Sequence, residues 1–121
     1  SAASDVYKRQ MQAHVELGML LSRYGALLTE RQRALLSMAV DEDLSLAEIA
    51  ERAGISRQGV RDAIQRASAQ LHAYEQALGM ERKAWAIREK AKALAALPCV
   101  QEDGEAQGLI QDIMEMMDDG I

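Results

Sequence analysis

Phenylalanine is absent from this 121-residue sequence, and cysteine, proline and tryptophan each occur only once. The single cysteine, Cys99, has no partner for a disulfide within the chain, so a reducing compartment fits best. No apolar run approaches the roughly 20 residues that a membrane-spanning helix needs, and the successive regions of a signal peptide do not appear in order. These absences argue against export and membrane insertion, and they predict a cytoplasmic location.

Residues that favour strands are scarce, whereas alanine, leucine, glutamate, glutamine, arginine and methionine are plentiful. That composition is typical of helices. Apolar residues make up 49% of the chain, which is enough for a core in one domain with or without a tail. We therefore expect an all-α protein.

The net charge of −5 is unusual for a protein that binds nucleic acid through phosphate contacts. The charges are segregated along the chain, however. Residues 102–121 hold acidic side chains and no lysine or arginine, whereas residues 80–97 form a secondary basic surface. That surface consists of Arg82, Lys83, Arg88, Lys90 and Lys92. Local charge is therefore more informative here than total charge.

Three segments are expected along the chain. Residues 1–10 are polar, show no helical apolar stripe and lack an initiating methionine, so we interpret them as a non-native leader with Met11 as a start. Residues 11–98 are predicted to form a helix-turn-helix domain. Residues 99–121 are predicted to form an acidic linker, 99–108, followed by a short amphipathic helix.

Apolar spacing and helix-capping residues predict the positions of the first three helices. A first helix is expected over residues 13–27, because leucines recur there at three- and four-residue steps. Thr29 with Gln32, and Ser45 with Glu48, have the spacing of capping boxes, and each pair predicts a helix start. Gly54 is expected to end the third helix in a left-handed conformation.

A long fourth helix is predicted from Ser56, its cap, to Gly79. Apolar residues from Val60 to Leu78 step by four and three, as in a coiled-coil seam. A similar seam follows in a fifth helix that Pro98 is expected to end. The matching seams predict that these two helices pack antiparallel as a hairpin, or that one of them forms a homodimer.

Residues 46–65 match the helix-turn-helix pattern position by position. Ala50 is small where two helices would cross, Gly54 occupies the turn, and Ser56 caps a helix whose first turns are polar on the outside. In such modules the second helix enters a groove, where short polar and arginine side chains reach base edges. The candidate nucleic-acid-binding residues are Ser56, Arg57, Gln58, Arg61, Gln65 and Arg66.

The charge of this module leaves its partner open. Between residues 29 and 71, six arginines stand against seven acidic residues, whereas a DNA reader normally has a more positive face. Helix-turn-helix folds also serve as protein-interaction and RNA-associated modules. Sequence-specific DNA binding and a different partner are thus about equally favoured by the residues alone.

Three stretches of the chain carry a family resemblance: LLSRYGALLT at 20–29, DLSLAEIA at 43–50 and SRQGVRDAIQR at 56–66. They resemble the YlxM family of small bacterial helix-turn-helix proteins, whose fold is related to region 4 of sigma factors. The family tends to have aromatic residues where this chain has Met38-Ala39-Val40, and tyrosine where this chain has Arg61. The acidic, methionine-rich tail lies outside the resemblance.

The resemblance implies a fold and a role. It implies a sigma region 4-like core. Together with the periodicity of the chain, the expected fold is this core with a long recognition helix, a helical hairpin and a short C-terminal helix. The resemblance also implies a regulatory accessory of the signal recognition particle that binds the particle's RNA or its GTPase. The alternatives are a DNA-binding transcription regulator and a self-associating scaffold that dimerises through the Val60–Leu78 helix or its hairpin.

A catalytic or metal site is not predicted, and neither is a cofactor. His14, His72 and Cys99 are too far apart in sequence to show ligand spacing, and no phosphate-binding glycine loop is present. For the tail helix, a plain amphipathic helix that folds back on the domain is slightly favoured over a partner-binding helix. A third hypothesis places the acidic tail over the basic fifth helix, where it limits access of nucleic acid.

Overall fold

The computed structural model describes residues 2–118, without the side chains of residues 7, 10 and 11. Within this range the elements are α1 (Ala2–Tyr24), the 3-10 helix η1 (Gly25–Leu27), α2 (Glu30–Val40), α3 (Leu46–Ala53), α4 (Arg57–Leu78), α5 (Met80–Ala95), α6 (Pro98–Gln101) and α7 (Gly104–Asp118). The described residues contain no strand, so the prediction of an all-α fold is confirmed.

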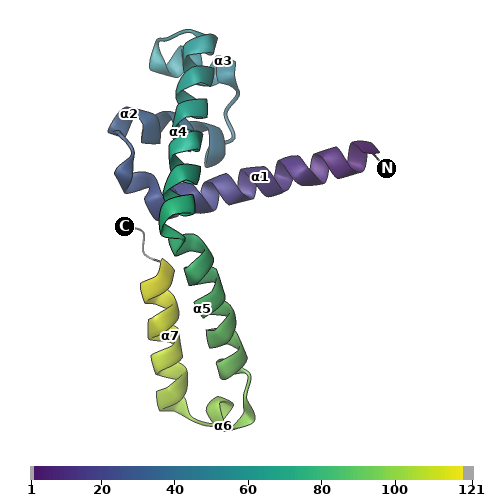
Figure 1. Cartoon of the computed structure of the whole chain (residues 1–121), viewed down its shortest axis with the longest axis vertical. Coiled ribbons are helices and arrows are strands. Elements are labelled where there is room, and N and C mark those ends of the chain that lie inside the picture. The colour runs from purple at the N-terminus through teal and green to yellow at the C-terminus, as the bar shows by residue number, and fades with distance from the viewer. Residues whose placement is uncertain (1, 119–121) are drawn as a thin grey trace.

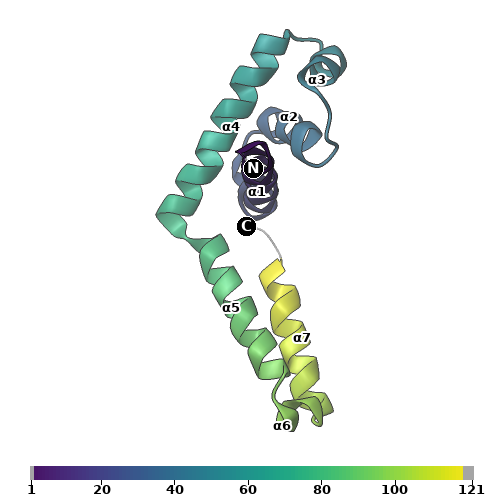
Figure 2. The same cartoon turned by 90° about the vertical axis from the view of Figure 1, so that its right-hand side faces the viewer.

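The helices form an upper module and a lower hairpin. Helices α2 and α3 and the end of α1 pack around α4, and the first part of α1 projects from this module (Figure 1). Helix α5 leads away from the end of α4 and pairs with α7, which runs back toward the module (Figure 2). The molecule is therefore elongated, with the helix-turn-helix at one end.

Both predicted capping boxes are present. The Thr29 hydroxyl accepts a hydrogen bond from Gln32 N at 3.1 Å, and the Gln32 side chain accepts one from Thr29 N at 3.1 Å. Ser45 and Glu48 form the same pair of bonds at 3.1 and 3.2 Å. Each box satisfies two N–H groups that a helix start leaves without partners, so α2 and α3 begin where these residues place them.

The turn of the helix-turn-helix depends on Gly54. Its φ of 71° lies in the left-handed region, which L side chains rarely adopt. In this conformation Gly54 N and Ile55 N both donate to Ala50 O, at 2.9 and 3.2 Å, and close the end of α3. Ser56 then accepts from Gly59 N at 3.0 Å and starts α4, so the predicted turn is confirmed.

Two apolar clusters share α4. One joins α1, α2 and α4, and its fully buried residues include Leu20, Tyr24, Leu36 and Leu71. The other joins α2, α3 and α4 around Ile49 and Val60. Because both clusters bury the same face of α4, they fix the long helix against the rest of the module.

The predicted antiparallel pairing of α4 with α5 is wrong. The seam of α4 is covered by α1, α2 and α3, and Val60, Ala67 and Leu71 are each 0% exposed. A dimer through this part of the seam would need a face that the chain already buries. The hairpin of the fold is instead formed by α5 and α7 (Figures 1 and 2).

Both termini contain more helix than expected. Helix α1 begins at Ala2 rather than near residue 13, because extending an existing helix by polar helix-forming residues costs little. The predicted linker 99–108 contains α6 and the first turn of α7. Asp103 starts α7, since its carboxylate accepts from Glu105 N at 3.1 Å and Ala106 N at 3.2 Å.

The tail helix folds back against α5. Ala84 and Ala91 of α5 and Ile110 of α7 are buried between the two helices. Gln107 donates to Val100 O at 3.1 Å, and Arg88 pairs with Asp118 at 2.6 Å. The acidic helix therefore lies beside the basic one, but at the opposite end of the molecule from the start of α4 (Figure 1).

Candidate nucleic-acid interface

The first turns of α4 present polar side chains away from the core. Val60 is buried and Ala63 and Ile64 are half-buried, so this face of the helix points inward. At 100° per residue, Gln58 and Gln65 lie on the opposite face, and Arg57 and Arg61 lie beside it, one turn apart. All four side chains are exposed. The structure therefore brings four of the six predicted residues onto one accessible strip, which we call the reading strip.

Ser56 and Arg66 occupy different positions from these four. The Ser56 hydroxyl accepts from Gly59 N, so its role in the structure is to cap α4. Arg66 is exposed but follows Arg57 by nine residues, which places it on the opposite flank of the helix. The predicted set of six thus divides into a reading strip, a cap and a separate cation.

Asp62 adds a contact that sequence analysis did not predict. The amide nitrogen of Gln58 donates to Asp62 Oδ1 at 2.9 Å, one turn along the exposed surface. This bond orients the Gln58 amide, and it also places a carboxylate beside the arginines. Because phosphate oxygens repel a carboxylate, Asp62 limits how much non-specific attraction the strip provides. The four-residue spacing of Gln58 and Asp62 could have indicated the bond.

Helix α3 contributes mixed charge next to this strip. In helix-turn-helix proteins the helix before the recognition helix crosses the nucleic-acid backbone. Here it exposes Glu48, Glu51 and Arg52. Arg52 is paired with Glu42 at 3.1 Å, and Glu48 serves in the capping box. The module thus has few cations in position to contact phosphates, in agreement with the nearly equal numbers of basic and acidic residues in its sequence.

The secondary basic surface does not form one patch. Arg82, Lys83, Lys90 and Lys92 are exposed, whereas Arg88 is half-buried and paired with Asp118. Lys92 lies 3.5 Å from Glu89. Helical spacing puts Lys83 and Lys90 on one side of α5 and Lys92 on another. The structure therefore spreads these cations around the helix.

The bend between α4 and α5 is held by two polar residues that sequence analysis missed. Gly79 provides no side chain to cap α5. Instead, Glu75 accepts from Glu81 N at 2.9 Å and Arg82 N at 3.1 Å, and Tyr24 OH accepts from Met80 N at 2.9 Å. Tyr24 OH also donates to Glu75 at 2.6 Å. Three free N–H groups at the start of α5 thus find partners on α1 and α4.

These contacts shift two pKa values in opposite directions. Burial raises the pKa of Tyr24 above 10.0, and its hydrogen bond to Glu75 raises it further. Burial alone would raise the pKa of Glu75, but the hydrogen bonds from Tyr24 and from the start of α5 outweigh it and hold that pKa below 4.5. The charged carboxylate is therefore the form that caps α5, where the helix dipole favours an anion.

An ion pair reinforces the same junction. Arg23 Nε lies 3.0 Å from Glu81 Oε2, and the two side chains are only 9% and 14% exposed. Arg23 precedes Tyr24 at the end of α1, so consecutive residues of α1 contact the start of α5. The bend is thus fixed by polar contacts from α1, and the hairpin has a defined direction relative to the module.

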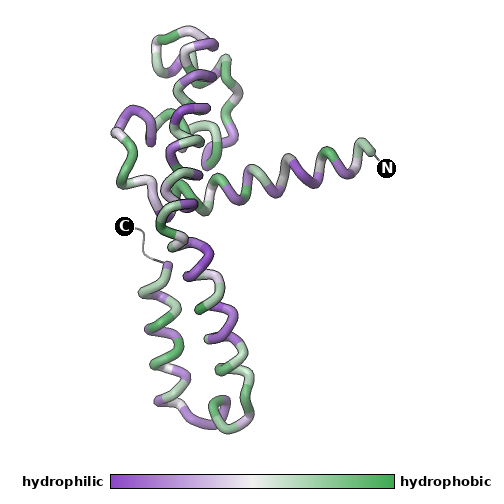
Figure 3. Tube along the Cα trace, in the orientation of Figure 1, coloured by the Kyte–Doolittle hydropathy of each residue, from purple (hydrophilic) through white to green (hydrophobic). Residues whose placement is uncertain are grey.

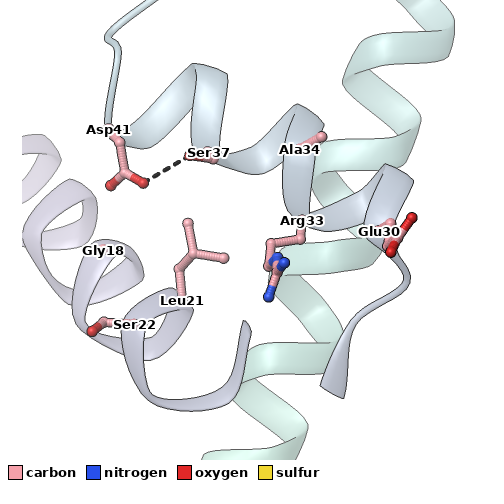
Figure 4. A pocket seen from close by; sticks show the side chains of 8 residues that line it. All are labelled: Gly18, Leu21, Ser22, Glu30, Arg33, Ala34, Ser37 and Asp41. Atoms are coloured by element: carbon pink, nitrogen blue, oxygen red, sulfur yellow. Dashed lines mark hydrogen bonds between the residues drawn. The ribbon is translucent and has the colours of Figure 1, made fainter. Parts of the chain in front are cut away.

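A cleft of about 550 Å³ lies between α1 and α2 (Figure 4), and its lining includes none of the four residues of the reading strip. Its polar lining includes Arg33, Ser22 and Asp41, and Asp41 accepts a hydrogen bond from Ser37 at 2.8 Å. The Ser37–Asp41 pair and Arg33 lie on opposite sides of the opening in this view. The cleft therefore shows no convergent set of reactive groups.

Among the described residues, neither histidine belongs to a group placed to bind a metal. Over residues 2–118, no three histidine, cysteine or carboxylate side chains are placed to hold a metal ion. His14 lies 3.1 Å from Asp43, and Cys99 is exposed. In the same range, no helix is both long and apolar enough to cross a membrane.

Comparison with known proteins identifies related sequences in several bacteria. A Clostridium botulinum UPF0122 protein is 47% identical over 73 residues, which cover 60% of this chain and 67% of that protein. A Clostridium perfringens UPF0122 protein is also 47% identical over 73 residues, or 65% of its length. A Desulforamulus reducens UPF0122 protein is 35% identical over 114 residues, covering 86% of this chain and 95% of the relative.

The clostridial alignments thus span about two thirds of those relatives, whereas the Desulforamulus alignment spans nearly all of its relative. The model of one protein family, UPF0122, matches residues 11–114. This range includes the helix-turn-helix and most of the α5–α7 hairpin. The chain therefore belongs to the UPF0122 family of YlxM/p13-like helix-turn-helix proteins.

Proposed function

We propose that this chain is a non-enzymatic regulatory protein that binds nucleic acid through the first turns of α4. The observation that carries the proposal is the exposed strip of Arg57, Gln58, Arg61 and Gln65 on a helix whose opposite face is buried. Arginine pairs with guanine and phosphate, and glutamine pairs with adenine, in the geometries that groove recognition uses. A fixed helix presents these groups at little entropic cost.

The signal recognition particle is the proposed setting for this activity. Membership in the YlxM-like family supports that choice, because the family resemblance implies an accessory role with the particle's RNA or GTPase. Such a role places the chain in the cytoplasm. The nearly balanced charge of the module is also easier to reconcile with a structured RNA or a protein than with tight non-specific DNA binding.

Duplex DNA is the second candidate, and the shape of the module favours it. A recognition helix fits the wide major groove of B-form DNA, whereas the major groove of an A-form RNA helix is too deep and narrow for side chains to read. Binding of α4 to RNA would therefore require a loop, a bulge or a widened groove. A sigma region 4-like transcription regulator is the function that this candidate implies.

Fluorescence anisotropy distinguishes the two candidates. The chain is titrated, at two salt concentrations, against signal recognition particle RNA, the labelled GTPase of the particle and a mixed-sequence DNA duplex. The proposed role predicts saturable binding to the RNA or the GTPase, with only weak and salt-sensitive binding to DNA. Appreciable affinity for the duplex alone would instead support the transcription regulator, and no binding to any of the three would contradict both.

A further inference from the structure

The α5–α7 hairpin buries very little of its own apolar surface. Its buried side chains are those of Ala84, Ala91 and Ile110, and α6 at its tip buries none. Two helices of this length normally need a larger core to stay paired in water. Hydrophobic positions nevertheless recur along both helices of the hairpin (Figure 3). Most of the large apolar side chains of the hairpin therefore lie on its outside.

Each helix of the hairpin carries an exposed apolar stripe. On α5 the stripe consists of Met80, Ile87 and Leu94, at seven-residue steps, and these side chains are between 38% and 49% exposed. On α7 it consists of Leu109, Ile113 and Met116, at steps of four and three, and these are between 45% and 74% exposed. Both stripes have the spacing of a helix seam, and neither is covered by another element within residues 2–118.

The two stripes lie on the same face of the hairpin. On α5, Ile87 follows the buried Ala84 by three residues, and on α7, Ile113 follows the buried Ile110 by three residues. Each stripe is therefore rotated by the same angle, in the same sense, from the line where the helices meet. Because α5 and α7 are antiparallel, equal rotations bring both stripes to one side. The hairpin thus has one continuous apolar face, which we call the outer face.

Charges of opposite sign border the outer face. Lys83 and Lys90 lie four residues before Ile87 and Leu94, at the outer edge of α5. Glu105 and Asp112 lie four residues before Leu109 and Met116, at the outer edge of α7. All four side chains are exposed. One edge of the face is therefore basic and the other acidic.

We propose that the partner of the outer face is a second copy of this chain. A two-fold axis parallel to α5 and α7 places α5 of one copy against α7 of the other, so each basic edge meets an acidic edge. A two-fold axis across the helices would instead place lysines against lysines. The charges thus favour the axis parallel to the helices. In that dimer α5 and α7 of both copies form a four-helix bundle, in which each helix is antiparallel to its two neighbours.

The heights of the charged residues agree with this arrangement. Gln107 donates to Ala95 O near the end of α5, and Asp118 pairs with Arg88 closer to the start of α5. Along the hairpin axis, Asp112 therefore lies between these two contacts. Lys90 lies in the same part of α5. An axis parallel to the helices preserves height, so Lys90 of one copy comes level with Asp112 of the other. The dimer contains this pair twice.

The dimer has a consequence for binding, which rests on the function proposed above. A two-fold axis along the hairpin leaves both helix-turn-helix modules at the same end of the assembly. Two α4 helices are then presented together, as in dimeric proteins that bind paired half-sites. The dimer itself does not depend on nucleic acid, so its test uses the protein alone.

Sedimentation equilibrium of the full chain measures the assembly directly. We expect a mass of two 13.3 kDa chains for the natural sequence. Ile113→Glu places a charge within the outer face and is expected to give single chains. Gln111→Glu adds the same charge to the other side of α7 and is expected to remain dimeric. Single chains for the natural sequence, or a dimer that Ile113→Glu leaves intact, would overturn the proposal.

A charge exchange tests the axis even where Ile113→Glu prevents folding. Lys90→Glu alone should weaken the dimer about tenfold, because both symmetry-related pairs become repulsive. Combining it with Asp112→Lys restores attraction, and the dissociation constant should return to near its original value. Circular dichroism verifies that each variant is folded. A double variant as weak as Lys90→Glu would contradict the pairing of α5 with α7 of the partner.

Discussion

At the scale of single residues, Tyr24 and Glu75 do the work that a capping side chain would normally do for α5. Gly79 ends α4 with a φ of 63° and has no side chain to offer, so the N–H groups that follow it need acceptors from elsewhere. A carboxylate from the last turns of α4 and a hydroxyl from α1 provide them. The orientation of the hairpin therefore depends on two oxygen-bearing side chains, the buried Tyr24 and the half-buried Glu75.

Tyr24→Phe is expected to lower the free energy of unfolding by about 1–2 kcal/mol, since it leaves Met80 N without a partner and removes one of the three hydrogen bonds that Glu75 accepts. Tyr74→Phe is the matched control, because its ring packs 6.1 Å from that of Tyr24 and lies at the edge of the same cluster. Urea unfolding monitored by circular dichroism measures both. Equal losses in the two variants would show that the Tyr24 hydroxyl has no special role.

Stability should also depend on the charge of Glu75. Its pKa is below 4.5 in the folded chain, so the carboxylate contributes stability that is complete above that ordinary value and is lost as the pH falls through the folded pKa. Glu75→Gln removes this contribution. We expect the variant to be less stable than the natural chain at neutral pH, and the difference to shrink in acid.

Urea unfolding of the two proteins, measured from neutral pH to below 4.5, tests this dependence. Every other carboxylate is common to both proteins, so its contribution cancels in the difference. A difference in stability that stays constant over the whole range would mean that the ionisation of Glu75 does not stabilise the junction.

At the scale of helices, the starts and turns of the upper module could be predicted because their signals are local. Thr29, Ser45 and Ser56 cap helices through hydrogen bonds to residues three positions later, and such bonds depend on few distant contacts. Gly54 and Gly79 both adopt the left-handed conformation that their positions indicate. The reading strip follows from the same spacing, so most of the candidate interface was predictable.

Gly54→Ala is expected to cost about 1–2 kcal/mol, because alanine pays the backbone penalty of a left-handed conformation. No neighbouring atom lies within 4 Å of the added methyl group, so packing contributes nothing to this cost. Gly104→Ala is the control, since its surroundings are equally open and its φ is not positive. Thermal unfolding should show a loss for Gly54→Ala alone.

At the scale of the whole molecule, the pairing of the helices was harder to predict than their positions. The apolar seams of α4 and α5 have matching steps. This spacing predicts that each helix buries one face, but it does not predict which neighbouring helix covers that face. Helix α4 buries its face against α1, α2 and α3, whereas α5 pairs with the tail helix α7. Pro98 and an acidic stretch precede the tail and predict a linker there, yet the chain turns at this point and continues as helix.

The polar junction was unpredictable for a related reason. Tyr24 and Glu75 are 51 positions apart, and Arg23 and Glu81 are 58 apart. Tyr24 lies within a leucine stripe, where an apolar role is the simpler interpretation, and Glu75 lies on a helix with many polar residues. Contacts at such separations follow from tertiary packing, which no local pattern in a single sequence reveals.

The central claim is that the first turns of α4 bind nucleic acid, and the most direct test is anisotropy with an Arg57→Ala/Arg61→Ala variant. Both arginines are exposed, so the fold should be unchanged, and circular dichroism verifies this. Lys92→Ala, together with Arg82→Ala, removes two exposed charges from α5 that lie away from the outer face, and serves as the matched control.

Whichever nucleic acid binds the natural chain, the α4 variant should bind it at least about tenfold more weakly, with a smaller salt dependence, because two cationic contacts are lost. The α5 variant should bind almost as well as the natural chain. An α4 variant with unchanged affinity, or a greater loss in the α5 variant, would contradict the claim and place the interface on the hairpin.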